Sequence, residues 1–452
     1  MMKVCKFGGS SLADAGQVAK VCDIVMSDPD RRLVVVSAPG KRHKQDIKVT
    51  DLLIACANAR LDGKPTADAL EAVVARYRAI QEELGVDPAV IDTIRENLFE
   101  TLGGNIEHRE RFMDAMKAAG EDNSARLVAA ELQRRGETAR YQNPGEAGLL
   151  LSGEYGNARL LHESYDNLAR LREADGITVF PGFFGYTREG EVVTFPRGGS
   201  DITGSILAAA VKAELYENFT DVDSVCAVDP DLASDVQPIT EITYREMREL
   251  SYAGFGVLHD EAIIPAVHAG IPIRICNTNR PELPGTLIMS EREVTHGTVV
   301  GIAGSSGFCT VFASKYLMNR EVGFGRRFLQ FFEEEGLSFE HMPSGVDNIS
   351  IILREEELDE STEARIVAHI RDELGADSVS VEHGLALVMI VGEGMRYTVG
   401  VSRRATAALS KADVNIEMIN QGSSEISIMF GVKEADRTSA MRALYNEFFE
   451  QG

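Results

Sequence analysis

The sequence predicts an α/β protein in which a mostly parallel open sheet lies between two layers of helices, followed by two ferredoxin-like modules. Two observations carry this prediction. Over roughly the first 290 residues, short apolar runs alternate with helical patterns, as in a parallel sheet covered by helices. From about residue 308 the chain repeats itself, and each copy reads strand, helix, strand, strand, helix.

The composition favours a soluble, cytoplasmic protein that binds small molecules. With 452 residues, the chain is long enough for two or three domains. Its formal net charge of −24 argues against nucleic acid or a membrane surface as a partner, because both attract basic patches. The six cysteines form no C-x-x-C pair, and no spacing indicates a metal site. We find neither a signal peptide nor an apolar run of about 18 residues.

The first candidate site is the stretch Lys6-Phe7-Gly8-Gly9-Ser10-Ser11, which reads as a strand, a glycine turn and a helix start. Two glycines let the backbone approach a ligand, and the N–H groups that follow point outward at a helix N-terminus. Lys6 adds a mobile positive charge. This suits a phosphate, although it matches neither a Walker loop nor a dinucleotide fingerprint. The alternative is an ordinary turn in which Ser10 or Ser11 caps the helix.

The next predicted strand is 33–36, whose consecutive apolar residues indicate burial on both faces. Ser37 and a locally basic loop follow its carboxyl end, where open α/β sheets bind ligands. A helix is expected to open at Thr50. Four more helices are predicted, at 69–84, 88–102, 106–119 and 124–135. We expect this helical block to be a covering layer, a lid or an oligomer contact, and we find no candidate site residue in it.

Residues 149–154 repeat the opening pattern of an apolar strand, small residues and a helix start. Glu154 would lie in the first helical turn, where it either complements the helix dipole or binds a ligand ammonium group. A buried strand at 177–180 and a short strand at 191–195 follow.

The second candidate site is Pro196-Arg197-Gly198-Gly199-Ser200-Asp201, directly before a helix of small residues. Arg197 can hold a carboxylate through two parallel hydrogen bonds. The glycines and Ser200 offer N–H groups at the helix N-terminus, and Asp201 can orient Lys6 or carry a metal bound to phosphate. Alone, this stretch is an unremarkable turn. Together with the first stretch, it indicates two glycine turns on one sheet.

A further strand is predicted at 214–219, with Thr220 and Asp221 at its end. Two helices and a last strand are expected after it, at 243–252, 254–270 and 272–276. The segment 277–297 contains several prolines and glycines, and it marks the natural domain boundary.

The second half of the chain is a duplication. Gly323 and Gly400 lie 77 positions apart, and the same offset pairs Arg326-Arg327 with Arg403-Arg404 and Glu340 with Glu417. A strand at 378–382 completes the first copy as βαββαβ, whereas the second copy lacks its sixth strand. Residues 298–303 are the expected donor, so we predict two interleaved modules, at about 307–383 and 384–452. Each module is expected to sense a small ligand, with a dimerisation platform as the alternative.

The two glycine motifs, Thr220-Asp221-Val222-Asp223 and the duplicated modules together resemble the aspartate kinases of the amino-acid kinase family, over essentially the whole chain. The resemblance implies a kinase domain at 1–290 with an αβα sandwich, and a regulatory region at 298–452 made of two ACT domains. It implies transfer of the ATP γ-phosphoryl group, with Mg²⁺, to the β-carboxylate of L-aspartate, the first step of lysine, threonine and methionine biosynthesis. In such enzymes the acyl phosphate forms by direct in-line attack.

The same resemblance implies roles for matching positions. Lys6 and Asp201 are expected to be catalytic, with Lys6 on the transferring phosphoryl group. ATP is expected to contact Lys6, Gly8, Gly9, Ser10, Thr220, Asp221, Asp229 and Pro230. The aspartate pocket is expected at Ser37, Thr50, Glu154, Phe183, Arg197 and Ser200, with Arg197 on the α-carboxylate and Glu154 facing the amino group. An effector site in the first ACT domain is expected at Met318, Gly323, Phe324, Gly325, Glu340 and Ser344.

Two departures from the family pattern remove positive charge. Many members carry lysine before Val-Leu-His, where this chain has Gly256, and arginine after Asp-Pro, where it has Asp231. Our hypothesis is that Lys41 or Arg42 in the basic loop compensates.

The expected partners are L-aspartate and, as feedback effectors, lysine, threonine or both. ACT pairs commonly join subunits, so a homodimer or a dimer of dimers is expected. Two alternatives stay open: a related kinase that phosphorylates glutamate or acetylglutamate, and a catalytically inactive amino-acid sensor.

Overall fold

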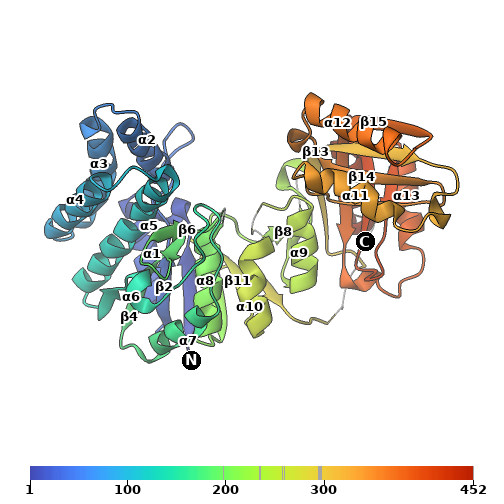
Figure 1. Ribbon diagram of the computed structural model, residues 1–452. Helices are drawn as coiled ribbons and strands as arrows, with labels where there is room; N and C mark the ends of the chain where they lie inside the picture. Colours follow the sequence, from blue (N-terminus) through green and yellow to red (C-terminus); the bar gives the residue numbers. More distant parts are fainter. Residues whose placement is uncertain (197, 234–235, 257, 259, 294–297, 451–452) are drawn as a thin grey trace. The chain divides into compact units, whose positions relative to one another are not determined.

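The computed structural model describes residues 1–196, 198–233, 236–256, 258, 260–293 and 298–450 (Figure 1). The chain forms two compact units. The first comprises Met1–Val225, Pro238–Met247 and Gly256–Arg292, and the second comprises Cys226–Gln237, Arg248–Phe255 and Glu293–Gly452. In the part of the chain that is described, no helix combines the length and apolar character that crossing a bilayer requires.

An eight-stranded sheet forms the centre of the first unit, in the order β10-β12-β11-β7-β1-β2-β4-β3. Its strands are β1 (Lys3–Phe7), β2 (Arg31–Val36), β3 (Ala139–Tyr141), β4 (Ile177–Pro181), β7 (Leu215–Thr220), β10 (Glu241–Thr243), β11 (Ile273–Asn277) and β12 (Thr286–Met289). Of these pairs, β11 with β12 is antiparallel and the others are parallel. The predicted mostly parallel open sheet is therefore confirmed.

Helices cover both faces of this sheet, which makes an αβα sandwich (Figure 1). Against one face pack α1 (Ala15–Met26) and α5 (Arg109–Arg134), and the outer helices α2 (Val49–Leu61), α3 (Ala67–Leu84) and α4 (Ala89–Leu102) share the same hydrophobic core. On the other face, α8 (Gly199–Ala210) contacts β1, β2 and β7, with α7 (Glu163–Ala169) and α10 (Ile264–Ala269) beside it. The smaller elements are α6 (Pro144–Ala147), α9 (Tyr244–Tyr252), β5 (Phe184–Tyr186), β6 (Val192–Thr194), β8 (Val225–Cys226) and β9 (Pro238–Ile239).

The predicted break between helices 106–119 and 124–135 is wrong, because both segments belong to the single helix α5. The polar run in its middle is buried rather than a loop. Asp122 and Asn123 both accept hydrogen bonds from the Asn97 side chain, at 2.9 and 3.1 Å. A helix tolerates buried polar residues when they have such partners.

The predicted strand and helix start at 149–154 are also wrong. Leu150 and Leu151 form only isolated bridges, and the chain turns back on itself, since the amide of Ser152 donates to the Arg159 carbonyl at 2.8 Å. The next helix begins at Glu163. Likewise β11 is not the last strand of the first unit, because β12 forms inside the segment expected to be a boundary.

The second unit contains one five-stranded sheet in the order β14-β13-β15-β17-β16, with all neighbouring pairs antiparallel. The strands are β13 (Gly301–Ser314), β14 (Asn348–Arg354), β15 (Ser378–Val391), β16 (Met418–Asn420) and β17 (Ser427–Lys433). The helices are α11 (Phe324–Glu334), α12 (Glu360–Asp372), α13 (Val401–Lys411) and α14 (Arg437–Tyr445).

The two modules are interleaved through β13 and β15, as predicted. The first part of β13, residues 301–305, pairs with residues 387–391, and its last part, 310–314, pairs with 378–382. The donor segment is therefore not a separate strand, because it continues into the first strand of the first copy. Gly307 (φ 85°) and Gly384 (φ 74°) both take left-handed conformations, which glycine adopts without strain, and they lie where each long strand passes from one module to the other.

Candidate functional site

The carboxyl ends of β1, β2, β4 and β7 meet at one edge of the sheet in the first unit, where α/β sheets bind their ligands. The amide of Gly8 donates to the Phe219 carbonyl at 3.1 Å, and the amide of Ser37 donates to the Phe7 carbonyl at 3.2 Å. A cavity of about 390 Å³ lies at this edge. It is lined by Lys6, Gly8, Gly9, Ser37, Lys48, Glu121, Phe183, Gly198, Gly199, Ser200, Asp201, Asn218, Thr220 and Gly256.

Lys6 points into this cavity from β1 and is held by two neighbours. Its ammonium nitrogen Nζ lies 2.6 Å from Asp201 Oδ1 and donates to Asn218 Oδ1 at 3.3 Å. Asn218 Nδ2 donates to the same oxygen of Asp201, at 2.7 Å. The Lys6 and Asp201 side chains are 9% and 17% exposed, so water screens their charges only weakly. The positive charge is thus fixed at one point of the wall.

The glycine turn after β1 is shaped by close backbone contact with the loop after β2. The amide of Gly40 donates to the Gly9 carbonyl at 2.8 Å. A Cβ atom on Gly40 would lie 2.6 Å from the Gly9 carbonyl carbon, and one on Gly9 would lie 2.9 Å from the Ala38 oxygen. Asp14 caps α1 by accepting from Gln17, so neither Ser10 nor Ser11 is the cap.

The N-terminus of α8 forms another wall. Gly198 caps it with a left-handed backbone (φ 76°), and Phe183 also has a positive φ, of 75°. A Cβ atom on Gly182 would lie 2.6 Å from Ser200 Oγ, so glycine lets the turn after β4 approach the helix end. The free N–H groups and positive dipole end of α8 favour an anion here. Arg197 lies outside the described residues.

Glu121 of α5 also lines the cavity, although no site residue is predicted in the helical block. Its Oε1 accepts the Ala38 amide at 3.0 Å, whereas Oε2 is buried without a hydrogen-bond partner in the described part of the chain. Burial raises the pKa of the Glu121 carboxyl to about 8. Gly120 allows this approach, because a Cβ atom there would lie 2.9 Å from Ala38 Cβ. A buried carboxyl oxygen without a partner is costly, and a ligand ammonium group beside it would stabilise the ionised form of Glu121.

A signal for Glu121 was present in the sequence. The run Glu121-Asp122-Asn123 follows apolar helical positions, and it lies in the break predicted between the helices at 106–119 and 124–135. Read as one helix, it would have placed an acidic group on a face packed against the sheet, where buried charges are unusual and often functional.

Several residues predicted to bind substrates do not line the cavity: Ser10, Thr50, Glu154 and Asp221. Glu154 is exposed, and a hydrogen bond from Ser152 holds the pKa of its carboxyl below the usual value. Asp229 and Pro230 belong to the second unit, where Asp229 accepts the Asp231 amide at 3.0 Å.

Lys48 lines the cavity as a second cation, directly before α2. In the basic loop, Arg42 forms an ion pair with Asp46, and its Nε lies 2.8 Å from Asp46 Oδ2. The hydrogen bond from Arg42 holds the pKa of the Asp46 carboxyl well below its usual value. Lys41 is exposed and does not line the cavity. Of the basic residues Lys41, Arg42 and Lys48, it is therefore Lys48 that lines the cavity.

The residues predicted to bind an effector lie in the second unit. Met318 and Phe324 are buried, and Gly323 caps α11 with a left-handed backbone (φ 80°). The Glu340 carboxylate lies 3.1 Å from Arg354 Nε and accepts from the Tyr252 hydroxyl. The amide of Asn319 donates to the Val346 carbonyl at 3.2 Å, which joins the Met318 turn to the loop after Ser344.

Comparison with known proteins identifies similar sequences and structures. The model of the amino acid kinase family matches residues 1–277, and an ACT domain model matches residues 388–448. The chain is 57% identical to aspartokinase 3 of Bacillus subtilis over 448 residues, covering 99% of both chains.

Solved structures of two relatives match over nearly the whole chain. The aspartate kinase of Clostridium acetobutylicum is 39% identical with a TM-score of 0.86, over 99% of this chain and 100% of that one. Escherichia coli aspartokinase III in complex with aspartate and ADP is 26% identical with a TM-score of 0.80, over the same shares of the two chains. The same enzyme in complex with lysine and aspartate is 25% identical with a TM-score of 0.76, over 99% of each chain.

Proposed function

Because the chain belongs to the aspartokinases of the amino acid kinase family, we propose that the cavity around Lys6 and Asp201 is its phosphoryl-transfer site. The chain is an aspartate kinase that uses ATP, and its ACT domains serve feedback regulation. One observation carries the assignment of the site. A nearly buried ammonium group and a helix N-terminus line the same cavity, in a chain whose net charge is −24.

The reaction needs charge neutralisation more than acid–base chemistry. An oxygen of the aspartate β-carboxylate, already ionised near neutral pH, attacks the γ-phosphorus of ATP. The new P–O bond forms as the bond from phosphorus to the bridging oxygen of ADP breaks, which yields 4-phospho-L-aspartate and ADP. Lys6 and the N–H groups of α8 stabilise the negative charge on the transferring group. Asp201 and Asn218 position the Lys6 ammonium for this task.

Glu121 is the proposed partner of the substrate ammonium group, in place of Glu154. It has a buried oxygen without a partner among the described residues, and it lines the same cavity as Lys6. Ser37, Phe183 and Ser200 also line the cavity and would contact the rest of aspartate. Arg197 stays the proposed partner of the α-carboxylate, on its position in the sequence alone.

Mg²⁺ accompanies ATP in the proposed reaction, and the residues present fit it. Magnesium is usually held by one or two carboxylates together with substrate phosphates. Asp201 uses Oδ1 for both Lys6 and Asn218, and its Oδ2 has no hydrogen bond within the described residues. That oxygen would hold the ion, which supplies further positive charge to the phosphates.

Replacing Lys48 by alanine should lower kcat/KM for ATP by about tenfold, because a cation that lines the cavity is lost. Steady-state kinetics at saturating aspartate would measure this change. Lys41→Ala is the matched control and should leave both kinetic constants unchanged, since Lys41 does not line the cavity. If Lys41→Ala produced the larger loss, the assignment of the second cation to Lys48 would be wrong.

We also propose a biological setting for this activity. The kinase domain, at about 1–290, would act in the cytoplasm as the first enzyme of lysine, threonine and methionine biosynthesis. Lysine is the proposed effector, because E. coli aspartokinase III has been solved with lysine. The effector site would lie at the Met318 turn and Glu340 in the regulatory region, 298–452, and subunits would join through ACT domains as a dimer or a dimer of dimers.

An aspartate-dependent kinase assay, with hydroxylamine trapping the acyl phosphate, tests this proposal. We expect turnover with aspartate but not with glutamate, and inhibition when lysine is titrated. Threonine should be titrated alone and together with lysine, because additive inhibition would identify a second effector. Turnover with glutamate alone would contradict the substrate assignment. No inhibition by lysine would contradict the effector assignment while leaving the kinase site intact.

A further inference from the structure

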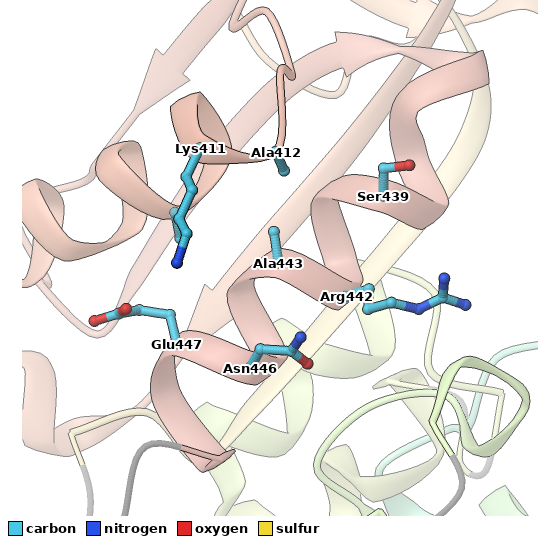
Figure 2. A pocket seen from close by; sticks show the side chains of 8 residues that line it. Lys411, Ala412, Ser439, Arg442, Ala443, Asn446 and Glu447 are labelled. Atoms are coloured by element: carbon cyan, nitrogen blue, oxygen red, sulfur yellow. The ribbon is translucent and has the colours of Figure 1, made fainter.

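The second ACT module contains a cavity that the kinase function does not use. It lies between α13 and α14, has a volume of about 380 Å³, and belongs entirely to the second unit. Figure 2 shows Ala412 and Ala443 in its middle, with Lys411 and Glu447 on one side and Ser439 and Arg442 on the other. Its size falls in the range of small-molecule sites, about 300–1,000 Å³.

The internal duplication shows what fills the corresponding groove of the first module. There Glu335 accepts two hydrogen bonds from Arg365, at 2.8 and 2.6 Å. Beside this pair, the Phe331 ring stacks on His369, with centroids 5.3 Å apart. The first groove is thus closed by an aromatic ring and a paired carboxylate of the chain itself.

The second module keeps the arginine but lacks both closing groups. At the offset of 77 positions, Arg442 corresponds to Arg365, whereas Ala412 replaces Glu335 and Ala408 replaces Phe331. Ala408, Ala412 and Arg442 all line the cavity. The cavity of the second module therefore lies where this module lacks the carboxylate that Glu335 supplies in the first.

The charges around the cavity favour an anionic group. Among the described residues, the Arg442 side chain forms one hydrogen bond, in which its Nε donates to the Leu232 carbonyl at 3.3 Å. Lys411 supplies a second cation, and Glu447 is already paired with Arg404, whose Nε lies 2.7 Å from its Oε1. A guanidinium group without a carboxylate partner can form two parallel hydrogen bonds with a ligand carboxylate.

We propose that the groove between α13 and α14 binds a small carboxylate of amino-acid size, whose carboxylate takes the place that Glu335 has in the first module. The ligand carboxylate lies against Arg442, its short carbon chain packs on Ala408 and Ala412, and Lys411 adds positive charge from the other side of the cavity. This site is separate from both the kinase cavity and the effector residues around Met318, and it does not depend on the proposed function.

The test observes Arg442 directly, so that binding at the kinase site cannot be mistaken for binding here. The Nε–H resonance of Arg442 is assigned by its absence from the spectrum of Arg442→Ala, using the full chain labelled with ¹⁵N. Succinate and L-alanine are titrated separately, because the first lacks an ammonium group and the second carries one. We expect a saturable shift with at least one of them, and the better ligand shows whether an ammonium group contributes.

Two variants sharpen the test. Ala412→Glu rebuilds the pair of the first module, so it should weaken binding by at least about tenfold. Arg403→Ala removes an exposed arginine of α13 that does not line the cavity, and it should leave the titration unchanged. Thermal melting checks that each variant is folded.

Three results would overturn the proposal. The Arg442 resonance could stay unmoved at high ligand concentration, or it could shift equally in Ala412→Glu. It could also respond to protein concentration and not to either carboxylate, which would make a second copy of the chain the occupant.

Discussion

Replacing Lys6 by methionine should lower kcat by roughly a thousandfold, the range measured when one charge-stabilising group is removed from a transition state. Methionine keeps an unbranched side chain of similar length but carries no charge. Asp201 would then lose its ion-pair partner in a poorly screened place, since it is only 17% exposed. The transferring phosphoryl group would also lose its fixed cation.

The hydroxamate assay with saturating ATP and aspartate measures this loss. Lys20→Met is the matched control, because Lys20 lies on the exposed side of α1, where its ammonium contacts Asn279 Oδ1 at 2.8 Å. The control should retain its activity. If Lys6→Met kept more than about a tenth of wild-type kcat, Lys6 would not stabilise the transition state as proposed.

Replacing Glu121 by glutamine should raise KM for aspartate by about 10- to 100-fold. This factor corresponds to the binding free energy that is lost with one charge-assisted hydrogen bond. The variant keeps the hydrogen bond from the Ala38 amide to its side-chain oxygen but cannot pair with an ammonium group. Glu154→Gln is the matched control and should leave KM for aspartate unchanged, because Glu154 is exposed and does not line the cavity. The opposite pattern would restore Glu154 as the binding carboxylate.

The difference in folding stability between Glu121→Gln and wild type should also depend on pH. Burial raises the pKa of Glu121 from an ordinary value of 4.5 to about 8. The folded state therefore holds this proton more tightly than the unfolded state. The protonated Glu121 carboxyl contributes to the stability of the folded wild type fully below pH 4.5, and this contribution is lost as pH rises through about 8. Glutamine has no proton to lose.

Melting curves without ligands at pH 5, 6.5 and 8.5 measure this effect. The melting temperature of Glu121→Gln relative to wild type should increase as pH rises across this series. A constant difference would mean that Glu121 does not titrate in the folded protein near pH 8. If Glu121→Gln is more stable than wild type at high pH but binds aspartate more weakly, Glu121 is retained for binding at a cost in stability.

The parts of the site that could be predicted from the sequence are those set by near neighbours in the chain. Lys6 and the Gly8–Gly9 turn stand at the end of one apolar strand, and Asp201 stands at the start of one helix. Parallel strands end at the same edge of a sheet, so these separate signals could be combined without knowing how the helices pack.

Glu121 and Asn218 could not be found in that way, because they lie inside a helix and a strand rather than at their ends. Glu121 enters the cavity because α5 runs unbroken past Ala38, and this depends on a glycine that allows close contact between distant segments. Asn218 lies within β7 next to another polar residue, Glu217, so its side chain does not stand out in the sequence as part of a site. Glu154 does not line the cavity, because the apolar run before it forms isolated bridges and not a strand that ends at this edge of the sheet.

The sequence by itself determined the alternation of strands and helices, the two glycine turns, the duplicated modules and their interleaving, because each depends on local patterning or on an internal repeat. Only the tertiary structure decided which carboxylate and which second cation enter the cavity around Lys6. It also showed that the groove beside Arg442 is open while its counterpart beside Arg365 is filled. These outcomes depend on side chains far apart in the sequence meeting in space, which local patterns do not encode.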